Sequence, residues 1–174
     1  MRARTMLCGV VTAAVMAFSG FGHAAAQPGD FSTLPVDPNL ITDSLAYNAA
    51  PLVLNPNGQP GVEAIYTHRD GSRQITSTIL VLPDVQAATA ALPAELAGKV
   101  ADGKTEPAAV GSAGTMVSGM SPDGSRSVTV LAFAEGNAAT TIEFAGALND
   151  PAPADLVLEL GRKQDTAIRD WQAA

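Results

Sequence analysis

Alternation of apolar and polar residues predicts a β-hairpin in the first half of the chain. Apolar and polar side chains alternate over 62–66, and 75–82 is rich in β-branched residues. Asp70 and Gly71, which lie between these two stretches, form a dipeptide that is typical of tight turns. The two stretches are therefore expected to pair as antiparallel strands.

A helix is expected to follow this hairpin. Pro83 ends the second strand, and Asp84 is placed to accept hydrogen bonds from the first free N–H groups of a helix. Apolar residues repeat at helical spacing at Val85, Ala88 and Leu92. Pro93 is expected to break this helix or to begin a second one. The polar stretch 102–107 is expected to be a loop.

A second β region and a final helix complete the pattern. Strands are predicted over 115–118, 127–133 and 138–144, with turn residues between them. A helix is predicted to begin at Asp150 or Pro153. One stripe of this helix, apolar except for Gln164, consists of Val157, Leu160, Gln164, Ile168 and Trp171.

Two residues of that stripe have consequences for packing. Gly161 costs a helix about 1 kcal/mol relative to alanine, so its presence predicts a close approach of the helix to the sheet. Trp171 either plugs the end of the helix or is an exposed recognition residue. Asp165 and Arg169 are spaced to form an ion pair along the helix.

The segment before the hairpin is rich in Pro, Asn, Asp and Gly. Residues 27–36 are expected to form a flexible arm, 39–47 one or two helical turns, and 52–54 a short strand. Residues 37–174 then form a single α+β domain. We expect a twisted antiparallel sheet of five or six strands, with a long C-terminal helix and a broken middle helix packed on it.

Residues 1–26 have the pattern of a cleaved secretory signal peptide. Arg2 and Arg4 give a basic start, an apolar run follows over 6–21, and 24–26 are alanines. Cys8 precedes most of the apolar run, so it is badly placed to become the lipidated first residue of a lipoprotein. We therefore expect a product released to the cell envelope or the medium, with no lipid anchor and no transmembrane anchor after cleavage.

The charge of the chain argues against two classes of partner. The chain has 10 Lys and Arg against 17 Asp and Glu, and loss of the two leader arginines takes the net charge from −7 to −9. The basic residues are scattered, so no basic stripe is available for a phosphate backbone. Binding to nucleic acid or to an anionic membrane surface is therefore not expected.

Few residues of the mature chain suit catalysis. Cleavage leaves no cysteine and a single histidine, His68, which disfavours a thiol nucleophile or a zinc centre. Ser121 resembles a nucleophile elbow but lacks its closing glycine. Carboxylates near the turns, at Glu63, Asp70 and Asp123, are the candidates for acid–base chemistry. We assign no catalytic residue, metal or cofactor.

A short internal repeat suggests a binding site. The sequence Asp-Gly-Ser-Arg occurs at 70–73 and at 123–126, each time in a turn that enters a strand. The two copies derive either from a duplicated ββα unit or from two independent hairpin turns. In the first case Arg73 and Arg126 would flank one cleft. These arginines and Trp171 are the candidate contacts to a ligand or partner.

Several segments resemble exported actinobacterial proteins of the Ala/Val-rich secreted and lipoprotein type. They are Val110-Gly111, 130–133 leading into 135–137, and Gln164-Asp165 in the last helix. The resemblance covers 62–171 and extends to LpqN-like proteins with a PsbP/Mog1-like fold. It implies binding or accessory roles at the envelope and no catalytic residues. The lipidated cysteine of the lipoproteins and the disulfides of related kinase sensor domains are missing here.

These observations favour a non-enzymatic exported protein that binds a small apolar or glycolipid ligand, or an envelope protein partner. Two alternatives remain open. One is a secreted antigen or interaction module that uses the segment 27–36. The other is a cell-wall hydrolase that works through two carboxylates.

Overall fold

The computed structural model describes residues 30–42 and 45–174, so the predicted leader and residues 27–29 lie outside the described part. Eight strands form one antiparallel sheet in the order β1-β3-β4-β8-β7-β6-β5, and β2 also pairs with β3. The strands are β1 (Tyr47–Ala49), β2 (Val53–Leu54), β3 (Gly61–His68), β4 (Gln74–Val81), β5 (Ala101–Pro107), β6 (Ser112–Met120), β7 (Ser127–Glu135) and β8 (Ala138–Gly146).

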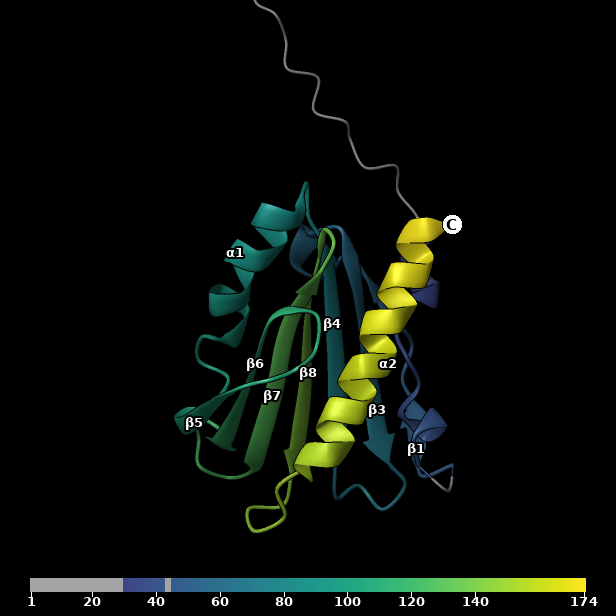
Figure 1. The fold of residues 1–174 in the computed structure, drawn as a ribbon. Coiled ribbons are helices and arrows are strands. Elements are labelled where there is room, and N and C mark those ends of the chain that lie inside the picture. Colours follow the sequence, from purple (N-terminus) through teal and green to yellow (C-terminus); the bar gives the residue numbers. More distant parts are fainter. Residues whose placement is uncertain (1–29, 43–44) are drawn as a thin grey trace, which may run out of the picture.

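Two α-helices cover opposite faces of this sheet. Leu131 and Phe133 of β7 belong to the main core beneath α2 (Ala154–Ala173), whereas Ala132 and Ala134 pack with residues of α1 (Val85–Leu96). Figure 1 shows α2 running across the front of the sheet and α1 to its left. Because successive side chains of a strand point to opposite faces, β7 is buried on both sides. The α+β class predicted from the sequence is confirmed.

The predicted hairpin is present as β3 and β4. The strands are joined by a turn in which Gly71 has a φ of +73°, and the His68 N–H donates to the Arg73 carbonyl at 2.8 Å. A second tight turn joins β7 to β8 at Gly136, whose φ is +53°. Both turns require the left-handed backbone region that glycine adopts readily. The local turn residues therefore determine where these strands reverse.

The sheet has more strands than the five or six expected. Residues 102–107, predicted as a loop, lie in the edge strand β5, and β1 begins within the stretch predicted to be helical. The described part of 39–47 begins with one 3₁₀ turn, Pro38–Leu40, so one of the expected one or two helical turns is present. Edge strands have little burial to impose an apolar–polar alternation, and β5 also changes register between Ala101 and Lys104. Their sequences therefore resemble loops.

The middle helix is a single element. It begins after Asp84, whose side chain accepts from the Ala87 N–H at 2.7 Å, and it continues through Pro93 to Leu96. The prediction of a broken helix was therefore wrong. Pro93 lies in the last turn, where its missing N–H removes a hydrogen bond but leaves the preceding turns intact.

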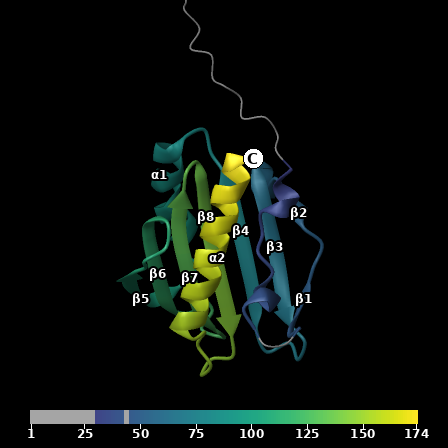
Figure 2. The same ribbon diagram turned by 45° about the vertical axis from the view of Figure 1, so that its right-hand side comes forward.

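The described part of the predicted flexible arm is packed on the core. Phe31 and Leu34 are buried, with 8 % and 0 % exposure, and a 3₁₀ turn spans Phe31–Thr33. The Gln164 side chain of α2 donates to the Leu34 carbonyl at 2.7 Å and accepts from the Val36 N–H at 2.9 Å. Figure 2 shows this segment beside α2 and β3. Its apolar residues and a buried amide hold residues 31–36 in place.

Close packing of α2 accounts for two features of its stripe. A Cβ atom added at Gly161 would lie 2.3 Å from Cδ2 of Leu131, which confirms the predicted close approach to the sheet. The Trp171 ring packs on Phe31 at a centroid distance of 5.9 Å. Trp171 therefore plugs the end of the helix. Within residues 30–42 and 45–174, no helix is both long and apolar enough to cross a membrane.

Candidate binding cleft

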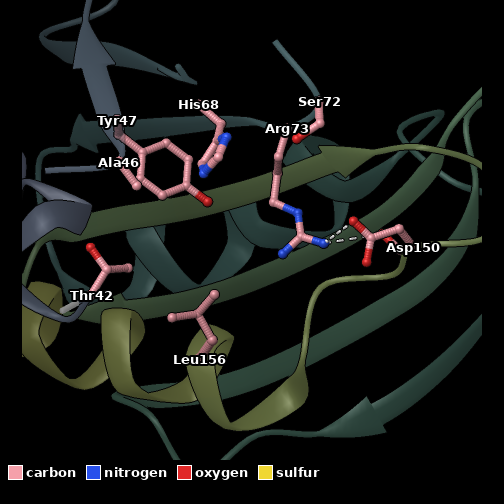
Figure 3. A pocket seen from close by; sticks show the side chains of 8 residues that line it. All are labelled: Thr42, Ala46, Tyr47, His68, Ser72, Arg73, Asp150 and Leu156. Atoms are coloured by element: carbon pink, nitrogen blue, oxygen red, sulfur yellow. Dashed lines mark hydrogen bonds and ion pairs between the residues drawn. The ribbon is translucent and has the colours of Figure 1, made fainter. Parts of the chain in front are cut away.

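An open cleft of about 450 Å³ lies at the end of the sheet where β3 turns into β4 and α2 begins. Four segments contribute to it: the stretch before β1, the β3–β4 turn, the loop before α2, and the first turn of α2. Its walls, shown in Figure 3, are formed by Thr42, Ala46, Tyr47, His68, Ser72, Arg73, Asp150 and Leu156. Most of these side chains are polar, so the cleft offers hydrogen-bonding groups.

Arg73 is the cation of this cleft, and its side chain is only 14 % exposed. Its Nη2 atom lies 2.6 Å from Oδ2 of Asp150 and also donates to the Asp150 carbonyl at 3.3 Å. Gly146 permits this approach, because a Cβ atom there would lie 2.8 Å from the Asp150 carbonyl oxygen. The loop before α2 can therefore fold back and hold the guanidinium in one position.

Tyr47 forms the opposite wall, and its hydroxyl points toward Arg73 (Figure 3). Burial raises the pKa of Tyr47 above its usual value, although the charge of Arg73 opposes the shift. The hydroxyl is therefore neutral at pH 7 and both donates and accepts. The Asn39 amide fixes the backbone of Tyr47 through two hydrogen bonds of 2.9 Å.

His68 lies between Tyr47 and the turn. Its ring meets that of Tyr47 edge-on at 5.3 Å, and its Nδ1 atom lies 2.5 Å from Oδ1 of Asp70. Hydrogen bonds from Ser72, and a further one from His68, hold the pKa of Asp70 well below its usual range. Asp70 thus orients both the histidine ring and the turn that carries Arg73.

Only one of the three predicted contact residues lies at the cleft. Arg73 lines the cleft, Trp171 packs on Phe31, and Arg126 is exposed outside the cleft. The two Asp-Gly-Ser-Arg turns do lie at the same end of the sheet, because β4 and β7 both begin opposite the end of β8. They continue differently, since β4 leads to α1 whereas β7 leads to β8.

The candidate catalytic residues are dispersed. Glu63 accepts a hydrogen bond from Thr78 on the sheet, while Asp70 and Asp123 each hold the backbone of their own turn. Ser121 is a turn residue, because its hydroxyl donates to Asp123 and accepts from the Arg126 N–H. These three carboxylates therefore do not converge on one site.

Sequence reasoning missed the rest of the cleft. Tyr47, Asp150 and Leu156 come from segments far apart in the chain, and none belongs to a recognisable motif. The sequence drew attention to His68 only because it is the single histidine of the predicted mature chain. The turn repeat was the one local feature that led to the cleft, through Arg73.

Comparison with known proteins bears on the fold alone. No family model matches the chain, and no curated protein matches it. The chain is similar to a solved structure, the extracellular domain of PknH from Mycobacterium tuberculosis, with a TM-score of 0.54 and 10 % sequence identity. The match covers 86 % of this chain and 100 % of that domain. The fold is therefore one that also occurs in a mycobacterial extracellular domain.

Proposed function

We propose that this protein is an exported, non-enzymatic binding protein whose cleft takes the hydroxyl-rich head of a small polar molecule. The observation that carries this proposal is the Arg73–Asp150 pair, held in a cleft beside the Tyr47 hydroxyl. A free sugar and the sugar head of a glycolipid share the required chemistry. The leader pattern, and a similar fold in a domain described as extracellular, support a place outside the cytoplasm.

The lining favours a neutral polar ligand. The guanidinium of Arg73 is balanced by Asp150, so an ionic ligand would gain little attraction. Hydroxyl groups both donate and accept, and they match the donors of Arg73 and the hydroxyls of Tyr47, Thr42 and Ser72. A volume of about 450 Å³ is within the range of small-molecule sites. A purely apolar ligand would bring no hydrogen-bonding groups to this polar lining.

The test is native mass spectrometry of the protein recovered from its natural producer. We expect a mass adduct of sugar or glycolipid on the wild-type protein, and its loss in Arg73→Met. Arg126→Met is the matched control, because Arg126 occupies the corresponding position in the other turn and lies outside the cleft. Retention of the adduct by Arg73→Met, or a clean apo mass for the wild-type protein, would overturn the proposal.

A second candidate is an interaction module that binds an envelope protein. Its support is a group of exposed apolar side chains within 40–54, including Leu40 at 69 % and Leu45 at 67 % exposure. No charged residue occurs from 45 to 62, although the chain is acidic elsewhere. In pull-downs from envelope extract, a Leu40→Ser/Leu45→Ser variant would lose a partner that Leu148→Ser, at an exposed leucine elsewhere, retains. Identical recovery by both variants would exclude this candidate.

A further inference from the structure

Near the middle of α2, away from the cleft at its first turn, a carboxylate is buried with one oxygen unpaired. Asp165 has a side chain that is 9 % exposed. Its Oδ2 accepts from Arg169 one turn further along the helix. Its Oδ1 is buried and has no hydrogen-bond partner among the described residues. A buried carboxylate oxygen without a hydrogen-bond partner destabilises the folded state, so a proton donor is expected at this site.

Glu135 is the titratable residue of β7 at this part of the interface with α2, where its carbonyl accepts from the Gln172 amide at 3.0 Å. It is the last residue of β7 and shares the face of Leu131 and Phe133, which pack beneath α2. Burial raises the pKa of Glu135 above its ordinary value of 4.5. A hydrogen bond and a charge interaction with Asp165 add to the shift, and Arg169 opposes it. A Cβ atom at Gly111 would lie near both Oδ1 of Asp165 and the carbonyl of Ala134, so the two carboxyl groups, hereafter the carboxyl pair, lie close together between β7 and α2.

The loop between β5 and β6 closes one side of this contact. A Cβ atom at Gly111, whose φ is +52°, would lie 3.3 Å from Oδ1 of Asp165 and 2.6 Å from the Ala134 carbonyl. Residues 108–114 carry no titratable side chain, and neither does Ala138 at the start of β8. Among residues 30–42 and 45–174, the charged groups at the site are Glu135 from β7, and Asp165 and Arg169 from α2.

We propose that Glu135 and Asp165 share one proton and act as a pH-sensitive latch between the end of β7 and α2. In the latched state the Glu135 carboxyl donates its proton to Oδ1 of Asp165, and Arg169 balances the one remaining negative charge. Loss of the proton to water leaves two carboxylates facing a single guanidinium. The latch is therefore closed in acid and weakened toward neutral pH.

Opening the latch has a predictable local effect. The α2 end is also tied to the β7–β8 turn, where the Gln172 amide donates to the Glu135 carbonyl at 3.0 Å and to Asn137 Oδ1 at 3.1 Å. Repulsion within the carboxyl pair pushes the same two elements apart. Deprotonation is thus expected to loosen the last turns of α2 while leaving the cleft, at the other end of the helix, in place.

The sign of the pH dependence follows from the direction of the shift. The pKa of Glu135 is higher in the folded than in the unfolded chain, so the folded state retains this proton longer. Its stabilising effect is complete below about pH 4.5 and is lost as the pH rises through the folded-state value.

Two measurements on the full mature protein test the latch. The first is a carboxyl-carbon NMR titration of the wild-type protein, which depends on no variant. We expect the Glu135 carboxyl to titrate above 4.5, the ordinary pKa value for glutamate. The second is the urea midpoint between pH 4 and pH 8, which we expect to fall as the pH rises. In Glu135→Gln the side-chain amide donates at every pH, so this part of the fall should disappear.

Glu159→Gln is the matched control, because Glu159 is exposed on the same helix, and it should follow the wild-type profile. If the urea midpoints of the wild-type protein and of Glu135→Gln changed with pH in parallel, the proposal would be overturned. Titration of the Glu135 carboxyl at or below its ordinary pKa value of 4.5 would also overturn it. Restoration of the neutral-pH midpoint by Ca²⁺ would do the same, because it would identify the carboxyl pair as a cation site.

Discussion

At the residue scale, Gln164 shows how one polar side chain orders a distant segment. It lies at an apolar position of the α2 stripe and is only 1 % exposed. Its amide binds the backbone of Leu34 and Val36, which lie about 130 residues earlier in the chain. The sequence identifies Gln164 as a polar residue on the buried face. It does not identify the partners, because no local pattern links the two segments.

Replacing Gln164 by methionine should destabilise the protein by about 2–4 kcal/mol. Methionine has a similar volume but leaves the Leu34 carbonyl and the Val36 N–H without partners. Urea denaturation measures the loss, and Lys163→Met, at an exposed neighbouring position, is the control. A loss equal to that of the control would show that these two hydrogen bonds do not hold the N-terminal segment.

Gly161→Ala should also be destabilising, although alanine is the better helix former. The new Cβ atom would lie 2.3 Å from Cδ2 of Leu131. Overpacking typically costs about 1–3 kcal/mol, against a gain in helix propensity of about 1 kcal/mol. Thermal unfolding of this variant beside Thr166→Ala, on the exposed face of α2, gives the comparison. A more stable Gly161→Ala protein would contradict the close helix–sheet contact.

At the scale of elements, the two edges of the sheet are protected in different ways. The outward backbone of β1 is capped at Tyr47 by the Asn39 amide, which occupies the place of a neighbouring strand. The edge at β5 carries the charges of Asp102, Lys104 and Glu106 and a change of register. Charges, irregular register and capped backbone all disfavour pairing with another chain.

Asn39→Ala should expose the edge at Tyr47. The Tyr47 N–H loses its acceptor, so its amide should exchange with solvent faster, and the protein should lose about 1–3 kcal/mol of stability. Hydrogen exchange followed by NMR reads this position directly. Asn48→Ala, at an exposed residue of the same strand, should leave the Tyr47 rate unchanged. Equal rates in Asn39→Ala and the wild-type protein would show that the amide cap has no protective effect.

The elements that could be predicted are those determined by residues close together in the sequence. The β3–β4 and β7–β8 hairpins follow from alternation and glycine turns, and α2 follows from its apolar stripe. Strand β5 was missed because an exposed edge strand has no buried face to impose a period of two. The N-terminal segment was predicted to be flexible, because Phe31 and Leu34 are too few to signal burial among prolines and polar residues.

At the scale of the whole molecule, α2 links two polar sites at opposite ends of the sheet. Its first turn contributes Leu156 to the cleft, and Asp165, near its middle, forms the carboxyl pair with Glu135 of β7. The cleft could not be predicted as a unit, because its residues converge only when four separate segments fold together. Of the residues that line the cleft, only Arg73 was a candidate contact from the sequence, on the basis of the repeated turn.

The most direct test of a sugar-binding cleft is an amide NMR titration of the protein with a panel of soluble disaccharides. We expect saturable shifts at the amides of Tyr47, His68 and Arg73, and their absence in Ser72→Trp, which fills the cleft. Ser125→Trp, at the same position of the other turn, should retain them. The absence of localised shifts in the wild-type protein, or equal shifts in Ser72→Trp, would contradict binding at this cleft.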